Sequence, residues 1–196
     1  MSDTATRLVD EARQLIMNNG YNGFSYADLA MRLGIRKPSI HHHFPSKVDL
    51  VVATVEQARA LIRAQTDMLE AKAPKAIDQL LAYTGYWERC IADQSAPFCL
   101  AGVLAAELPS LPAEVASAVR GHFHDLAKWL ERVLALGVEQ GTMKLAQSPK
   151  AEAEIFMADV YGAMLSARAF DDPHRFKAVV DAAIGRILVN PRDGNR

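Results

Sequence analysis

Apolar residues recur along this chain three or four positions apart, which is the spacing of one face of an α-helix. Near the N-terminus such a face consists of Leu8, Ala12, Leu15 and Ile16. Gly20 follows it as a stop signal, and no segment alternates long enough to predict a strand. A second helix is expected between the cap at Ser25 and the turn at Gly34, and the later ones at about 37–43, 47–70, 74–93, 97–108, 112–140, 149–170 and 173–189. The pattern predicts an all-α protein of about nine helices.

Residues 25–50 combine a capped helix, a glycine turn and a second short helix. Ser25 followed by Asp28 has the pattern of a capping box, and Gly34 supplies the turn. Two helices joined in this way are typical of a helix-turn-helix, whose second helix enters the DNA major groove. We therefore expect a DNA-binding domain of three helices over 1–46 and a second helical domain over 47–196.

Charge and composition exclude several classes of protein. The formal net charge is −1, whereas an architectural protein that coats DNA should be strongly basic. One positive face is still enough for sequence-specific binding. Two cysteines in 196 residues predict no disulfide framework and suit a reducing cytosol. Without a signal-peptide pattern or an apolar run long enough to span a membrane, we expect a cytoplasmic protein.

The motif in residues 25–50 resembles that of the TetR family of transcriptional regulators. The family pattern is a Ser or Thr cap, a leucine-alanine helix, a Gly-hydrophobic turn, a short recognition helix and Phe-x-x-Lys-x-x-Leu. It is met here by Ser25, Leu29-Ala30, Gly34-Ile35, Lys37 to His43 and Phe44 to Leu50. The resemblance implies a non-enzymatic homodimer without a cofactor. Its partners would be double-stranded operator DNA and a small-molecule effector bound in the domain over 47–196.

The same resemblance implies roles for individual residues at the DNA. Ser25 and Lys47 look like phosphate contacts, which position a protein on the duplex. The candidates for base edges or nearby phosphates are Arg36, Lys37, Ser39 and His42. The family usually has Tyr at the position of His41, and often Tyr or His at that of His43. His41 can still donate a hydrogen bond to phosphate, more strongly when protonated, so that contact is expected to depend on pH.

The run His41-His42-His43 also raises the question of a metal site. Successive side chains on a helix point about 100° apart, so three neighbouring imidazoles cannot converge on one ion. We therefore expect no metal there, and exposed histidines without a role are the further alternative.

The resemblance implies that the helices at 149–170 and 173–189 form a four-helix bundle with those of a second subunit. Small residues follow one side of the first helix, at Ala158, Gly162, Ser166 and Ala169. The second helix has an apolar stripe made of Phe176, Val180, Ile184, Ile187 and Leu188. The alternative is that both stripes pack inside one subunit.

The effector pocket is expected among the helices between these two regions. Tyr83, Trp87 and Cys90 fall at i, i+4 and i+7, which gives one helix face aromatic rings with polar tips. Such a face suits a small hydrophobic or aromatic ligand. Further candidates for the lining are Phe98, Cys99, Leu104 and Phe123. Plain core packing is the alternative for each of them.

Residues 98–107 resemble a branch of the family with Cys-x-x-Gly-x-Leu-Ala-Ala-Glu at this place, in which some members sense electrophiles with thiols. A cap at Ser95 and a first turn at Pro97 would leave Cys99 within the first turn of a helix. The backbone amides of a first turn favour a thiolate. The alternative is that Cys99 is a small buried residue, which is the usual fate of a free cysteine.

Together these features predict a ligand-responsive transcriptional regulator, with repression from a palindromic operator as the leading hypothesis and activation left open. A cysteine-dependent enzyme is one alternative, although no set of nucleophile, base and orienting group is visible in the sequence. A non-specific architectural DNA-binding protein is the other.

Overall fold

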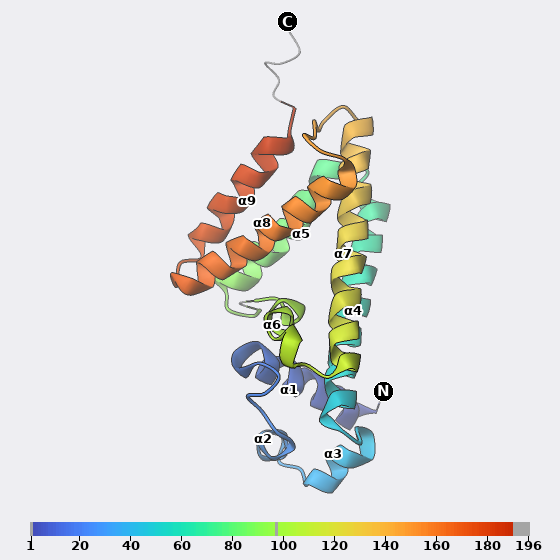
Figure 1. Ribbon diagram of the computed structural model, residues 1–196, viewed down its shortest axis with the longest axis vertical. Coiled ribbons are helices and arrows are strands. Elements are labelled where there is room, and N and C mark those ends of the chain that lie inside the picture. Colours follow the sequence, from blue (N-terminus) through green and yellow to red (C-terminus); the bar gives the residue numbers. More distant parts are fainter. Residues whose placement is uncertain (1, 97, 190–196) are drawn as a thin grey trace, which may run out of the picture. The chain divides into compact units, whose positions relative to one another are not determined.

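A computed structural model describes residues 2–96 and 98–189 (Figure 1). Within this part of the chain the structure contains α-helices, one short 3₁₀ segment at Leu108–Ser110 and no strand longer than an isolated bridge. The helices are α1 (Asp3–Asn19), α2 (Tyr26–Leu33), α3 (Lys37–His43), α4 (Lys47–Lys72), α5 (Ala76–Ala92), α6 (Leu100–Ala106), α7 (Ala113–Glu139), α8 (Pro149–Ala169) and α9 (His174–Ile187). The all-α class is confirmed, and no helix in the described residues is long and apolar enough to cross a membrane.

The chain divides into two compact units. The first consists of Met1–Arg63 with Cys99–Phe123, and the second of Ala64–Phe98 with His124–Arg196. Helices α4 and α7 each contribute residues to both units. The first unit therefore extends beyond the DNA-binding domain expected over 1–46, because α6 and the start of α7 complete its hydrophobic core.

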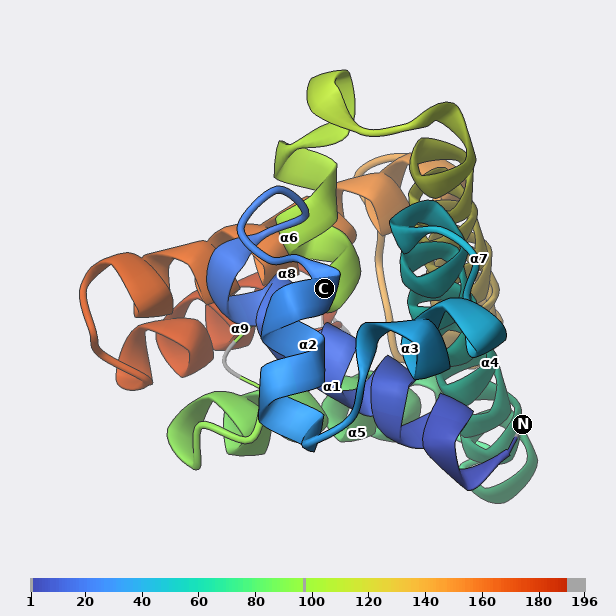
Figure 2. The same cartoon turned by 90° about the horizontal axis from the view of Figure 1, so that it is seen from below.

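The core of the first unit joins all of its helices. Leu8 and Ile16 of α1 are fully buried, as are Leu29 of α2, Ile40 of α3 and Leu50 of α4. α6 and α7 add the buried side chains of Leu100, Leu104, Val115 and Val119 to the same cluster. Figure 2 shows α1, α2 and α3 from below, with the short α3 next to the N-terminal end of α4.

Two capping boxes begin the helices on either side of α3. At the start of α2 the backbone N–H and the hydroxyl of Ser25 both donate to the Asp28 carboxylate, at 2.7 and 2.8 Å. At the start of α4 the N–H of Ser46 donates to Asp49 at 2.9 Å, and the N–H of Asp49 donates back to the Ser46 hydroxyl. The exchange satisfies donors that a helix start otherwise leaves without partners. Both helix starts expected from the sequence are confirmed.

The second unit is built around the pair α8 and α9, which lie side by side (Figure 1). The ion pair of Arg186 with Asp159, at 2.7 Å, connects the two helices at the surface. The apolar stripe of α9 faces its own chain, since Phe176 and Val180 are almost completely buried. For that helix the stripe thus packs within one subunit, the alternative considered above.

Gly34 should be hard to replace, because it ends α2 in the left-handed region with φ of 65°. A Cβ atom at this position would meet nothing within 4 Å, so the cost of Gly34→Ala is conformational and not steric. We expect a loss of about 1 kcal/mol in the free energy of unfolding, measured by urea titration.

Gly85→Ala provides the matched control, because Gly85 lies inside α5 with ordinary van der Waals space around it. Here alanine should stabilise the protein by up to about 1 kcal/mol, since it favours the helix. Equal effects of the two substitutions would contradict the assignment of strain to the turn.

Candidate DNA-binding surface and effector region

Helix α3 is attached to the core by one face and leaves the other face free. Ile40 is fully buried, whereas Arg36, Lys37 and His42 are exposed. Arg36 is the N-cap residue of α3, and its side chain makes no capping hydrogen bond. Ser39 is half-buried on the same helix. The exposed face of α3 thus carries cationic and hydrogen-bonding groups of the kind that contact bases and phosphates.

The three histidines of α3 lie in different surroundings. His41 places its Nδ1 atom 3.1 Å from the carbonyl oxygen of Pro45, and its ring packs edge-on against Tyr26 at 4.9 Å between centroids. His42 and His43 contact each other edge-on at 5.2 Å. If Nδ1 of His41 donates to that carbonyl, Nε2 remains for an outside partner. Among the described residues, no group of three His, Cys, Asp or Glu side chains is arranged to hold a metal ion.

Tyr26 fixes the corner between α3 and α4. Its hydroxyl lies within hydrogen-bonding distance of the carbonyl oxygens of Phe44 (2.9 Å) and Ser46 (2.6 Å), to which it donates. Burial, with smaller effects of the charges of Asp49 and Tyr21, raises the pKa of Tyr26 from 10.0 to about 12. The neutral hydroxyl is therefore the form that the folded corner requires. Tyr26 was not among the residues singled out from the sequence, because nothing in the local pattern pairs it with a carbonyl group 18 positions away.

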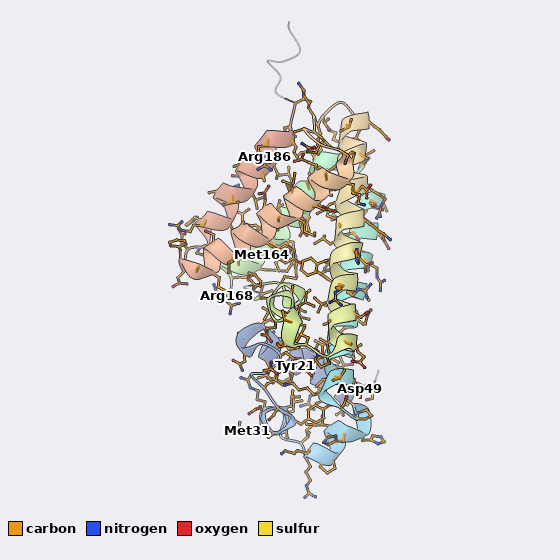
Figure 3. All side chains as sticks on the ribbon, viewed as in Figure 1. Tyr21, Met31, Asp49, Met164, Arg168 and Arg186 are labelled. Atoms are coloured by element: carbon orange, nitrogen blue, oxygen red, sulfur yellow. The ribbon has the colours of Figure 1, made fainter. Side chains whose placement is uncertain are left out.

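Lys47, the first residue of α4, folds back over the first unit. Its Nζ donates to the carbonyl oxygen of Phe24 at 2.5 Å and lies over the rings of Tyr21 and Phe24, at 4.6 and 4.2 Å from their centroids. Burial lowers the pKa of Lys47, and the charges of Asp28 and Glu107 oppose that shift. The ammonium group therefore anchors α4 to the turn before α2. Figure 3 shows Tyr21 and Asp49 in this part of the structure.

Cys99 does not lie in the first turn of a helix. It is the N-cap residue of α6, which begins at Leu100, and its side chain is buried. The expected first turn at Pro97 falls outside the described residues. The Cys99 Sγ atom lies 3.7 Å from Nε2 of the buried His122. A buried imidazole is thus a contact partner of the thiol.

The other effector candidates divide between the two units. In the second unit, the ring of Tyr83 contacts Trp129 at 5.3 Å, Trp87 contacts Tyr86 at 5.2 Å, and Cys90 is buried. Also in this unit, Phe98 lies below the guanidinium group of Arg168, which is labelled in Figure 3. In the first unit, Leu104 is fully buried in the core and Phe123 packs against that core.

Trp129 is a residue that the sequence analysis did not single out. Its side chain is 2% exposed, and its indole Nε1 atom has no hydrogen-bond partner among the described atoms. A buried N–H group without an acceptor is costly, by about 1–3 kcal/mol. It is therefore a candidate donor to a bound molecule next to Tyr83.

Comparison with known proteins agrees with this arrangement. Residues 8–54 match the family described as bacterial regulatory proteins, tetR family, and residues 76–183 match the tetracyclin repressor-like C-terminal domain. A crystal structure of a TetR-family transcriptional regulator from Agrobacterium tumefaciens superposes with a TM-score of 0.92 at 49% identity, covering 94% of this chain and 97% of that one.

The HTH-type transcriptional repressor NemR of Escherichia coli strain K12 is 26% identical over 168 residues, which are 85% of this chain and 84% of that protein. The crystal structure of the reduced form of NemR shares the fold, with a TM-score of 0.84 at 23% identity, 96% coverage of this chain and 100% of that one. This chain therefore belongs to the TetR family. It is a ligand-responsive, DNA-binding transcriptional regulator.

Replacing Tyr26 with phenylalanine should destabilise the protein at neutral pH by about 1 kcal/mol, because the carbonyl oxygens of the α3–α4 corner lose their donor. A raised pKa in the folded state stabilises the protein at pH values below the ordinary value of 10.0. That contribution is lost as the pH rises through about 12. The difference in unfolding free energy between the two proteins, measured by urea titration, should therefore shrink from pH 10 to 12; a constant difference would contradict the assignment.

Proposed function

We propose that this regulator is a repressor that binds a palindromic operator as a homodimer and is released by a small apolar or electrophilic effector. The observation that carries the DNA-binding part is the division of α3 into a buried face at Ile40 and an exposed face at Arg36, Lys37 and His42. Two such helices in a dimer would read half-sites about one helical turn of DNA apart.

The contacts proposed from the sequence fit this arrangement. Lys37, Arg36, Ser39 and His42 would face bases or nearby phosphates from α3. Ser25 and Lys47 would contact phosphates at the starts of α2 and α4, together with His41 and His43. The hydroxyl of Ser25 also serves its capping box, and the ammonium of Lys47 also holds Phe24, so both groups would be held in place before DNA arrives.

For the dimer interface we propose the exposed sides of α8 and α9. Ala158 and Gly162 lie on the surface of α8, and a Cβ atom at Gly162 would meet nothing within 4 Å. Leu165 is 59% exposed on the same helix, and Val179 is 38% exposed on α9. Small residues beside exposed apolar ones permit close approach of a second subunit, which would cover this surface.

The effector would act at one of two places. In the second unit, the half-buried ring of Tyr83 packs against the buried Trp129, and a planar ligand with a carbonyl group that entered beside them would accept the hydrogen bond of the indole N–H. In the first unit, the Cys99 thiol could add to an electrophilic carbon, as in a quinone ring. An S–C bond would form as a ring C=C bond opens and its electron pair moves to the conjugated carbonyl oxygen, while the thiol proton passes to His122 and from there to that oxygen.

Lys37 and Lys47 should affect DNA binding in different ways. Lys47→Met keeps an unbranched side chain and removes the ammonium group, together with its hydrogen bond to the Phe24 carbonyl oxygen and its contact with the Tyr21 and Phe24 rings. It should weaken binding to every duplex and reduce the salt slope by about 0.9 per half-site. Lys37→Met should instead relax base preference at one operator position. The measurement is fluorescence anisotropy on a selected duplex and its single-base variants over a range of salt concentrations; a swap of the two behaviours would reverse the assignments.

The effector proposal is tested by titrating the protein with a duplex that it selects from a randomised pool, with and without benzoquinone. We expect quinone to weaken binding by tenfold or more in the native protein and in Cys90→Ser. Cys99→Ser should keep the affinity and lose the response. A response that survives in Cys99→Ser would move the effector site to the neighbourhood of Tyr83 and Trp129, and failure to select any duplex would overturn the DNA-binding proposal.

A further inference from the structure

Helix α6 is a short connector within the first unit, with a polar contact at each end. It has seven residues, from Leu100 to Ala106. At its start the Cys99 thiol contacts His122 of α7. At its end Glu107, the C-cap residue, contacts the turn that follows α1. A displacement of α6 along its axis would therefore have to break or move both contacts.

The contact at the end of α6 leaves no room for a side chain on Gly20. The Glu107 Oε2 atom accepts a hydrogen bond from the backbone N–H of Tyr21 at 2.9 Å, across 86 positions of sequence. Its Oε1 atom lies where a side chain of Gly20 would begin, since a Cβ atom built on Gly20 would be 1.9 Å away. Gly20 also has φ of 73°, which other residues rarely adopt. The backbone after α1 is thus shaped to receive this carboxylate.

The same turn connects to both helix starts that we propose to contact DNA, those of α2 and α4. The Tyr21 ring lies under the Lys47 ammonium, which is held by the carbonyl oxygen of Phe24. Ser25 follows directly and begins α2. Glu107, Tyr21 and Lys47 therefore form a continuous series of contacts from the end of α6 to the first residue of α4.

The Glu107 carboxylate beside Gly20 is not explained by stabilisation of helix α1. The C-terminal end of a helix carries a partial negative charge, so an anion beside Gly20 is disfavoured by the helix dipole. An apolar side chain would fill the space without that cost. What the carboxylate adds is a directional bond to one backbone N–H, which fixes the turn relative to α6.

We propose that Glu107 is a positioning residue for DNA binding, which holds the turn Gly20–Ser25 to the end of α6 and so couples that turn to the Cys99–His122 contact at the other end. The inference rests on the proposed function, because it takes the residues beside this turn to contact DNA. It does not require Cys99 to be the natural sensor.

Coupling between two sites is reciprocal. Bound DNA should therefore make the local opening of the chain around Cys99, at the start of α6, less frequent. Cys99 is 4% exposed, and a thiol reagent can reach it only after a local opening. The labelling rate of Cys99 by N-ethylmaleimide therefore reports that opening. We use a Cys90→Ser background, in which Cys99 is the one cysteine left, and a duplex that the protein selects from a randomised pool.

The decisive variants are Glu107→Leu, which keeps volume but removes the acceptor, and Glu107→Gln, which keeps a carbonyl oxygen without the charge. Glu114→Gln is the matched control, because Glu114 is an exposed acid of the same unit whose charge also acts on Tyr21. Saturating duplex should slow Cys99 labelling about fivefold or more in the background protein, in Glu107→Gln and in Glu114→Gln. In Glu107→Leu the effect of DNA should fall to within about twofold.

Two results would overturn the inference while leaving DNA binding intact. One is labelling in the background protein that does not change with bound duplex. The other is an undiminished effect of duplex in Glu107→Leu. If Glu107→Leu does not fold, Gly20→Ala replaces it, because the added Cβ displaces the carboxylate. Failure to select any duplex would instead overturn the proposed function, and this inference with it.

Discussion

The recognition helix depends on one buried contact. α3 has seven residues, too few for an isolated helix to be stable in water, so tertiary packing must hold it. Ile40 supplies that packing from the middle of the helix, and the Tyr26 hydroxyl holds the corner that follows. Because the anchor occupies a single face, Arg36, Lys37 and His42 remain exposed for DNA. Every proposed base contact therefore depends on the burial of one isoleucine.

Local signals in the sequence were sufficient for most of the secondary structure. Ser25 with Asp28 and Ser46 with Asp49 lie three positions apart, so a capping box is readable without knowledge of the fold. The TetR motif added the identity of the recognition helix. Gly34 could be placed in a turn because glycine, which has no Cβ atom, tolerates the left-handed φ that such a turn requires.

The tertiary contacts were not readable in the same way. The bond from Tyr21 to Glu107 joins positions 86 apart, and no periodicity encodes such a pairing. Cys99 was expected in the first turn of a helix over 97–108, whereas α6 begins at Leu100, because the start of a short helix is set by packing as much as by its caps. The α9 stripe was apolar as expected, but a stripe does not say whether its own chain or a second one will cover it. The contacts with DNA and with the effector are predictions, because they depend on the shape of the bound molecule as well as on this chain.

The first unit is made of two separate segments of the chain, and this has a consequence for protein engineering. Regulators of this kind invite the construction of chimaeras, in which the DNA-reading segment of one protein is spliced to the sensing segment of another. A splice after residue 46 would leave behind α6 and the start of α7, which belong to the same compact unit as α1 to α3. The donor's Gly20 would then face a foreign side chain in place of Glu107. A functional chimaera should therefore take both segments of the first unit, Met1–Arg63 and Cys99–Phe123, from the same protein. The DNA-binding part of this chain cannot be exchanged as one continuous N-terminal segment.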